Sequence, residues 1–296
     1  MRLIVTIRQL KIRASGNRCE LATQAPMLSP SVSTRVSLIA IVAVLYAVGK
    51  GLTAYVPTPW GIGQLLVGIF IPAFFAVVAE TVPVAIGAGL GTFIGDVIFL
   101  TPLGGTNPAL SLIAGVPANF FAFLLFGWFV KRYRSWGGFV AATVSFVTLG
   151  NLIAATSVVL FGAYVFAPAA VLSNFSLPGL ILGFTVFWNM SSIPAIVIAV
   201  PLLVRAVTPL FGRSRILQAK PNWSLGVGGR QAGISLAFAF LFLLVGLAYL
   251  VWAPNSVAIW PGLTDYFVAA AAIVLVFAPV ASVVAGTKVQ AKQTAP

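Results

Sequence analysis

VPVAIGAGLGTFIGDVIFL, residues 82–100, is an apolar, glycine-rich stretch that contains one carboxylate, Asp96. About 20 predominantly apolar residues are enough for a helix to cross the hydrocarbon core of a bilayer. A spanning helix also satisfies its own backbone hydrogen bonds, as lipid requires. The stretch is therefore predicted to be a membrane-spanning helix with a charge inside it.

The composition of the whole chain agrees with this interpretation. Of 296 residues, 60% are hydrophobic and 7% are charged, and the mean hydropathy is +1.08, whereas soluble domains carry about 25% charged residues. We expect an all-α, multi-pass protein of the cell membrane, a bundle of about eight transmembrane helices in the lipid bilayer. The expected helices lie near 36–56, 62–79, 82–100, 108–130, 137–166, 179–204, 234–253 and 264–286.

Basic residues fall on one side of this arrangement. Every Lys and Arg except Lys50 lies before the first span or within 131–134, 205–230 and 287–296. The loops on the other side contain none of them: 57–61, 101–107, 167–178 and 254–263. Because cytoplasmic loops retain positive charge, both termini are predicted to be cytoplasmic. This topology and anionic lipid headgroups account for the net charge of +13, so nucleic-acid binding is not indicated.

The chain divides into five regions along the sequence. A basic cytoplasmic tail precedes the first span, and it either belongs to the protein or reflects an over-extended start, since Met27 stands just before that span. The single cysteine, Cys19, lies in this tail, which leaves no disulfide within the chain. The regions are the tail (1–35), a core of six helices (36–205), a basic cytoplasmic linker (206–233), two additional helices (234–286) and a cytoplasmic tail (287–296).

Polar side chains inside the predicted helices are the candidates for function, because a charge near a helix centre costs about 2.5–3.5 kcal/mol. Lys50 and Asp96 each lie about 14 residues, or roughly 21 Å, from the predicted cytoplasmic end of their helix. They therefore share a depth in the outer half of the bilayer. Four further side chains are predicted near this level: Asn119, Asn151, Trp188 and Asn189. We expect these residues to line a polar, aromatic-walled cavity that binds substrate.

A structural interpretation of the same residues stays open. Lys50 and Asp96 could be a charge pair that locks two helices, and the asparagines could be interhelical hydrogen bonds. For each asparagine taken alone the structural interpretation is favoured. For the charge pair the structural and the functional interpretation are equally favoured, because placing two charges inside the membrane costs too much free energy for a purely structural role to be the simpler explanation.

Small residues recur every four positions on two of the predicted helices. They are Gly87, Gly91 and Gly95 on one helix, and Ala43, Ala47 and Gly51 on the other. Such ridges let another helix approach closely. Asp96 is adjacent to the glycine ridge, so its side chain is expected to point into the bundle.

Catalysis is not indicated by the residue inventory. The chain has no histidine, which removes HExxH metalloprotease and Ser/His chemistry, and it has no GxxxxGK[ST] loop for ATP. An aspartyl intramembrane protease needs two carboxylates at one site, but Asp265 is predicted at an outer helix end and Phe93 replaces the first glycine of the GxGD motif. We therefore expect no enzyme activity, cofactor or metal site. A transporter of this kind must use an ion gradient or a separate ATPase.

Between residues 45 and 100 the order of features resembles the substrate-binding S component of energy-coupling factor (ECF) transporters. The features are an alanine-spaced first helix, a short Pro-containing outer loop, GIFIP at 68–72 and a Gly-rich helix ending in GD at 95–96. The resemblance covers about 36–205, the six helices usual in that family. The last two helices depart from it, as does Glu80 where the family often has glycine, which implies an extended or divergent member.

The resemblance implies that the chain is one subunit of an importer. Such a subunit captures a vitamin or its precursor, or a metal ion, from outside and associates with a transmembrane coupling protein and two ATPases. The small residues of the first helix, Ala43, Ala47 and Gly51, would form the coupling surface, and Trp60 would lie over the ligand. With no histidine and one outward carboxylate in the core, an organic molecule is favoured over a metal ion.

Two other functions stay open at this point. A self-sufficient secondary transporter would use Asp96 as its proton or sodium carboxylate, and its helices should show an internal repeat. No convincing repeat relates 36–130 to 137–253. A non-transporting scaffold is the other possibility, but that function does not explain why several polar residues are predicted at one depth in the membrane.

Overall fold

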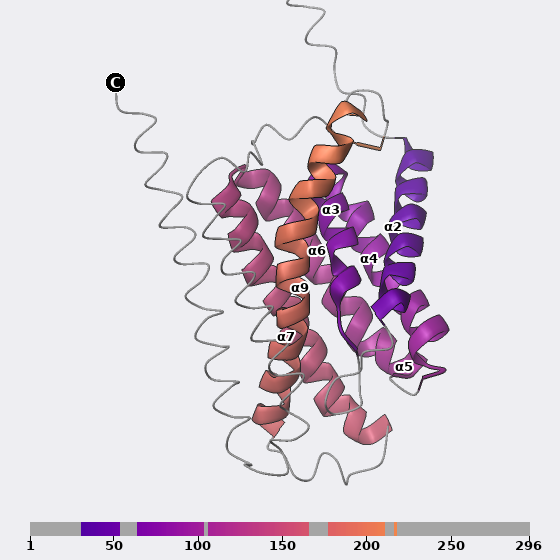
Figure 1. Ribbon diagram of the computed structural model, residues 1–296. Coiled ribbons are helices and arrows are strands. Elements are labelled where there is room, and N and C mark those ends of the chain that lie inside the picture. Colours follow the sequence, from indigo (N-terminus) through magenta and orange to yellow (C-terminus); the bar gives the residue numbers. More distant parts are fainter. Residues whose placement is uncertain (1–30, 54–63, 104–105, 166–176, 211–215, 218–296) are drawn as a thin grey trace, which may run out of the picture. The chain divides into compact units, whose positions relative to one another are not determined.

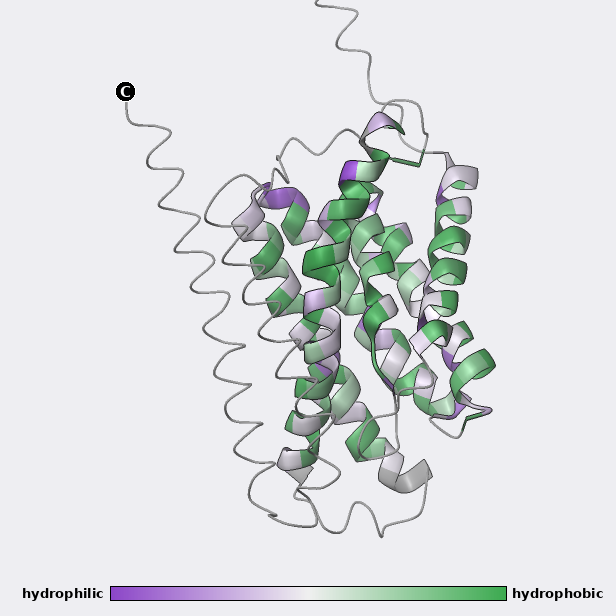
Figure 2. Ribbon diagram, in the orientation of Figure 1, coloured by the Kyte–Doolittle hydropathy of each residue, from purple (hydrophilic) through white to green (hydrophobic). Residues whose placement is uncertain are grey.

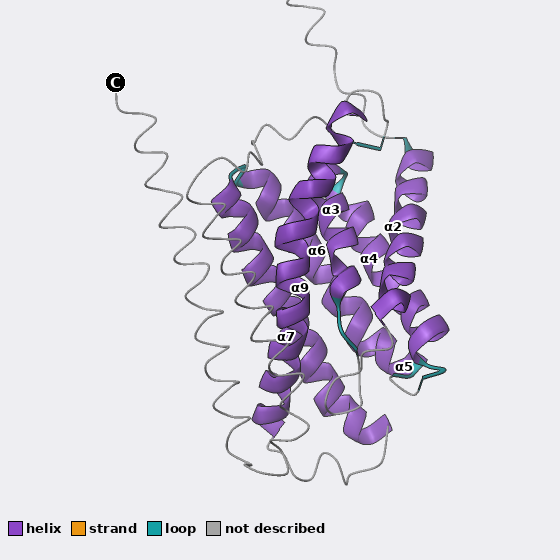
Figure 3. Ribbon diagram, viewed as in Figure 1, coloured by secondary structure: helices purple, strands orange, loops and turns teal. Residues whose placement is uncertain are grey.

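The computed structural model describes residues 31–53, 64–103, 106–165, 177–210 and 216–217. Within these residues the regular elements are helices (Figure 3). In chain order they are α2 (Val32–Thr53), η1 (Val67–Ile69), α3 (Phe70–Val78), α4 (Thr81–Gly95), η2 (Asp96–Leu100), α5 (Pro108–Leu110), η3 (Ser111–Gly115), α6 (Val116–Arg132), α7 (Trp136–Val165), α9 (Leu177–Val207) and η4 (Thr208–Leu210).

Five helical segments of the described residues are long and apolar enough to cross a bilayer. They are Val32–Thr53, Thr81–Leu100, Pro108–Arg132, Trp136–Gly162 and Pro178–Val207. Their positions agree with the expected first, third, fourth, fifth and sixth spans, so the chain is a multi-pass helical membrane protein. The predicted helices at 234–253 and 264–286, the predicted tail at 287–296 and most of the linker lie outside the described residues. So do residues 1–30 of the tail predicted at 1–35, whereas its last residues belong to α2, which begins at Val32.

The second expected span differs from its prediction. Its helical part begins at Val67, not near residue 62, because the backbone at Leu66 has φ −106° and ψ 47°, outside the helical region. Here the chain passes very close to α2: a Cβ on Gly68 would lie 2.5 Å from the carbonyl carbon of Gly49. The apolar helix Val67–Val78 is about 18 Å long, shorter than the roughly 30 Å hydrocarbon core.

Consecutive helices run in alternating directions, which gathers the basic residues at one end of the bundle. The start of α2 and the end of α9 both lie at this end, the upper end in Figure 1. Figure 2 shows hydrophobic residues along the shafts and hydrophilic ones gathered at helix ends. Among the described residues, all Lys and Arg other than Lys50 lie at this basic end: Arg35, Lys131, Arg132, Arg134 and Arg205.

The turn between α3 and α4 is fixed at the basic end by two cations. Arg35 Nε lies 2.8 Å from Glu80 Oε2. Glu80 is the N-cap residue of α4, but its side chain makes no capping bond. Lys131 Nζ donates to the Ala79 carbonyl and, at 2.7 Å, to Thr81 Oγ1. The Arg35–Glu80 pair is partly exposed and contributes at most about 1 kcal/mol, so this corner joins α2, α4 and α6 without forming a deep site.

The glycine ridge of α4 faces α2. A Cβ on Gly91 would lie 2.7 Å from the Ala43 carbonyl oxygen, and one on Gly95 would lie 3.2 Å from the Ala47 Cα. Gly87 also faces α2, since its Cβ would meet backbone and side-chain atoms of that helix. The two small-residue ridges predicted from the sequence thus pack against each other, which is the usual arrangement for closely crossing membrane helices.

This packing disagrees with the expectation that Ala43, Ala47 and Gly51 form a surface for a partner. Ala43 and Ala47 are each only 4% exposed, because the glycines of α4 cover them. Gly51 is buried as well, and a Cβ there would lie 2.8 Å from the ring of Phe99. The small residues of α2 therefore hold this chain together, and the exposed face of α2 is the opposite one.

The packing predicts a clear difference between two glycine-to-alanine changes. Gly91→Ala should destabilise the protein by about 1–3 kcal/mol, because the new methyl group meets a backbone oxygen that moves only with the whole of α2. Gly162→Ala in α7 is the control, since no atom of the described residues lies within 4 Å of a Cβ there. It should be neutral or stabilising by about 0.5–1 kcal/mol through helix propensity. Melting temperatures in detergent measure both, and equal values would contradict the close α2–α4 contact.

Candidate functional site

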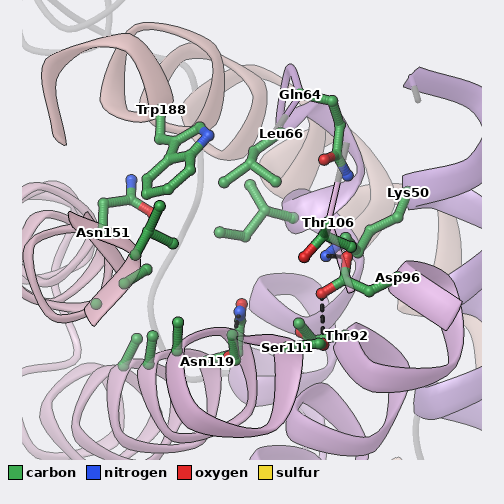
Figure 4. Close-up of a pocket in the computed structure, with 18 of the residues that line it drawn as sticks. Lys50, Gln64, Leu66, Thr92, Asp96, Thr106, Ser111, Asn119, Asn151 and Trp188 are labelled. Atoms are coloured by element: carbon green, nitrogen blue, oxygen red, sulfur yellow. Dashed lines mark hydrogen bonds and ion pairs between the residues drawn. The ribbon is translucent and has the colours of Figure 1, made fainter. Parts of the chain in front are cut away.

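A cavity lies among the helices, in the half of the bundle away from the basic end. Residues from α2, η1, α4, η2, α5, η3, α6, α7 and α9 line it (Figure 4). The empty space amounts to about 680 Å³, a figure that includes space continuous with the exterior.

An ion pair forms one wall of the cavity. Lys50 Nζ lies 2.5 Å from Asp96 Oδ1, and each residue is 5% exposed. The hydroxyl of Ser111 donates to Asp96 Oδ2 at 2.6 Å. Both carboxylate oxygens are therefore bonded, one to a cation and one to a hydroxyl, so the charges compensate each other within the wall.

Two irregular helical turns bring this wall together. Asp96 and Ser111 are the first residues of the π-helical segments η2 and η3. In η2 the Thr101 amide donates to the Asp96 carbonyl at 2.8 Å, one residue further along than in an α-helix. Gly115 ends η3, and a Cβ there would lie 2.7 Å from Thr92 Cγ2 and 3.3 Å from Asp96 Oδ2. Only glycine allows this approach, and π turns of this kind are frequent at functional sites.

Asn119 lines the cavity but has both ends of its amide engaged. The hydroxyl of the fully buried Tyr46 donates to Asn119 Oδ1 at 3.0 Å, and Asn119 Nδ2 donates to the Gly115 carbonyl at 2.9 Å. These bonds join α2 to α6 beside the ion pair. Asn119 therefore holds the wall in place and has less capacity left for a ligand.

Asn151 lines the cavity on α7, and Asn189 lies behind it on α9. Asn151 Nδ2 donates to Asn189 Oδ1 at 2.9 Å. Asn189 has no exposed surface and is a supporting residue for Asn151. Asn189 Nδ2 has no hydrogen-bond partner within the described part of the chain.

Two side chains carry hydrogen-bond donors that remain free at the cavity. Trp188 Nε1 and Gln64 Nε2 are buried and have no partner among the residues that the structure describes. Trp188 is 6% exposed and packs with its ring centroid 5.3 Å from that of Phe184. Gln64 is 3% exposed and precedes η1. Figure 4 shows the Trp188 indole and the Gln64 side chain at the border of the cavity.

The structure thus places most of the predicted site residues around one cavity. The predicted residues that line it are Lys50, Asp96, Asn119, Asn151 and Trp188. Asn189 is one layer behind, and Trp60 lies outside the described residues. Gln64 and Ser111 were missed by the sequence analysis, although each is a polar residue inside an apolar run.

The donor set does not favour a metal ion. No group of three or more His, Cys, Asp or Glu residues occurs within the described ranges. The carboxylate at the cavity is already bonded to Lys50 and Ser111, whereas hard cations require several free oxygen ligands. The arrangement is suited to hydrogen bonding of an organic molecule against apolar and aromatic walls.

Comparisons with known proteins give no identification. No protein-family model matches the chain, and neither a curated protein nor a solved structure matches it. The function proposed below therefore depends on the cavity.

Proposed function

We propose that this chain is the membrane-embedded substrate-binding subunit of an ECF-type importer. It captures a small organic micronutrient, a vitamin or its precursor, from outside the cell. It then couples to a separate transmembrane protein and two ATPase subunits that supply the energy. The observation that supports this proposal is a cavity lined by a buried ion pair and by buried hydrogen-bond donors that have no partner among the described residues, between helices long enough to span a membrane.

Binding fits the cavity better than catalysis does. The one carboxylate is neutralised by Lys50, and the chain contains no histidine that could act as a base. A general base must have a proton acceptor free to reach the substrate. The chain also has no phosphate-binding loop for ATP, so active uptake requires another energy source.

The proposal requires the cavity to face the outside and the basic end to face the cytoplasm. In a chain carrying Cys19→Ser, a cysteine at Leu103 should react with a membrane-impermeant maleimide in intact cells. A cysteine at Ser135 should react only after permeabilisation. Both positions are exposed and lie at opposite ends of the bundle, so they form a matched pair. Labelling of Ser135→Cys in intact cells would reverse the orientation.

A partner that contacts α2 would meet the face opposite the alanine ridge. That face carries exposed aliphatic side chains, among them Val44 (57% exposed), Val48 (48%) and Leu52 (78%). Val44→Trp should therefore impair transport by the assembled importer and leave the isolated chain folded. Ala43→Trp should prevent folding, because α4 occupies the space that the ring would need.

Purification of the tagged full-length chain from its own host tests the proposal. A transmembrane coupling protein and two ATPase subunits should copurify, and mass spectrometry should detect a small organic molecule released from the chain on denaturation. A preparation that contains neither would contradict the proposal.

A secondary transporter is the alternative, and the buried carboxylate of Asp96 in a spanning segment favours it. Such a transporter would accumulate substrate in proteoliposomes without any other protein. Uptake that is driven by a proton or sodium gradient and lost in Asp96→Asn would support this alternative over the ECF subunit.

A further inference from the structure

Among the residues that the structure describes, the charges that border the cavity add to zero. Lys50 and Asp96 are the charged residues among the described residues that line it, and they lie 2.5 Å apart. Both are almost completely buried. An ionised ligand would add an uncompensated charge to this buried space, which is costly in a region of low dielectric. A ligand with no net charge avoids that cost.

Two buried hydrogen-bond donors at the cavity have no partner among the residues that the structure describes. Trp188 Nε1 can only donate, and Gln64 Nε2 is the donor end of its amide. Each is more than nine-tenths buried, and neither has a partner among the described residues. A buried donor without an acceptor destabilises a protein. Acceptor atoms on a ligand, such as a carbonyl oxygen or a ring nitrogen, would satisfy these groups.

One wall of the cavity is built from very small side chains. Ala114, Ala118 and Ala122 recur every four residues along η3 and α6, and Gly150 and Ala154 line the cavity from α7. Residues four apart lie one above the other on a helix face, so the alanines form a flat apolar strip. A flat molecule packs closely against such a strip.

We propose that the cavity selects a small, planar molecule that is uncharged and carries hydrogen-bond acceptors. Its acceptors bind Trp188 Nε1 and Gln64 Nε2, its flat face lies on the alanine strip, and the Lys50–Asp96 pair stays formed beside it. This inference rests on the binding function proposed above and specifies the chemical class of the molecule bound.

Three probes of nearly equal size and shape test the charge requirement. Benzamide is uncharged, benzoate is an anion and benzamidinium is a cation, and all three are planar. With the full-length chain in detergent, calorimetry should give a dissociation constant for benzamide about tenfold below those of both ions. An ion that binds as tightly as benzamide, or no measurable binding of benzamide, would overturn the inference.

Changing the charge of the cavity wall should change which of the three probes binds most tightly. Asp96→Asn leaves the wall with one positive charge, so benzoate should become the preferred probe. Lys50→Met leaves one negative charge, so benzamidinium should become the preferred probe. An unchanged preference for benzamide in both variants would show that the charge of the pair does not select the ligand.

The donor requirement is tested by a variant that keeps the ring and the charges. Trp188→Phe removes the Nε1 hydrogen bond and should weaken benzamide binding by about 2- to 12-fold. Trp128→Phe is the matched control, because Trp128 is 61% exposed and does not line the cavity. Equal affinity in the Trp188→Phe variant and the unmodified chain would exclude the indole as a ligand contact, whatever the behaviour of the charge variants.

Failure of this inference can be told apart from failure of the proposed function. A charged molecule released from the purified chain would contradict the inference and leave the binding function standing. Absence of any released molecule, together with no response to the three probes, would contradict both.

Discussion

Asp96→Leu is expected to lower the free energy of unfolding by about 3–5 kcal/mol, because it leaves the Lys50 ammonium group buried without a counter-charge. Lys50 is 5% exposed, and its Nζ lies 2.5 Å from Asp96 Oδ1. Ser111 would also lose its acceptor at 2.6 Å. Asp96→Asn should cost less, since the amide keeps an oxygen for Lys50. Thermal unfolding in detergent measures both variants.

Adding Lys50→Met to Asp96→Leu should restore most of this stability, because the two changes remove the pair together. Recovery of stability alone does not separate a structural pair from a binding pair, so benzamide affinity is measured in the same preparations. If the pair contacts the ligand, the stable double variant should still bind benzamide about tenfold more weakly. Full recovery of affinity would show that the pair does not contact the ligand.

Hydropathy was sufficient to find the long helices, because a spanning segment must be apolar over its whole length. The depth count then placed Lys50 and Asp96 at one level, and the structure joins them in an ion pair. That inference worked because rise per residue is nearly constant along a helix. Position along a helix is thus much easier to obtain from sequence than rotation about its axis.

The rotation of each helix about its own axis could not be predicted from the sequence, and it decides which neighbour a side chain faces. The spacing of Ala43 and Ala47 marks a close-packing face, but it does not say whether that face meets another helix of the chain or a partner protein. Ser111 was missed because its orientation depends on the π segments, and each residue beyond the α-helical repeat rotates the following side chains by about 100°. Pro117, which cannot donate to a carbonyl in the preceding turn, was a signal that this helix is irregular.

Gln64 was missed for a different reason. It lies in a segment that hydropathy assigns to a helix, but residues 64–66 are not helical in the structure. The close crossing of Gly49 in α2 and Gly68 in η1 is a tertiary contact between two separate helical elements. Local patterns do not encode such a contact, so the free amide at the cavity was visible only in three dimensions.

Ala118→Leu is expected to abolish ligand binding without loss of stability, which is the opposite of its usual effect in a packed core. Ala118 is 2% exposed and lines the cavity, so the added carbons enter empty space. In a packed region the same enlargement costs about 1–3 kcal/mol. Benzamide would have to share the space with the leucine, and its dissociation constant should rise about 100-fold, equivalent to about 2.8 kcal/mol.

Two other alanines make this result decisive. Ala142→Leu, at a fully buried position of α7 that does not line the cavity, should lower the melting temperature through overpacking. Ala40→Leu, at an exposed position of α2, should change neither stability nor affinity. If Ala118→Leu destabilises the chain as much as Ala142→Leu, the space beside Ala118 is not free to receive a ligand. If Ala118→Leu is stable and binds benzamide normally, the ligand occupies another part of the protein, because a filled cavity cannot hold it.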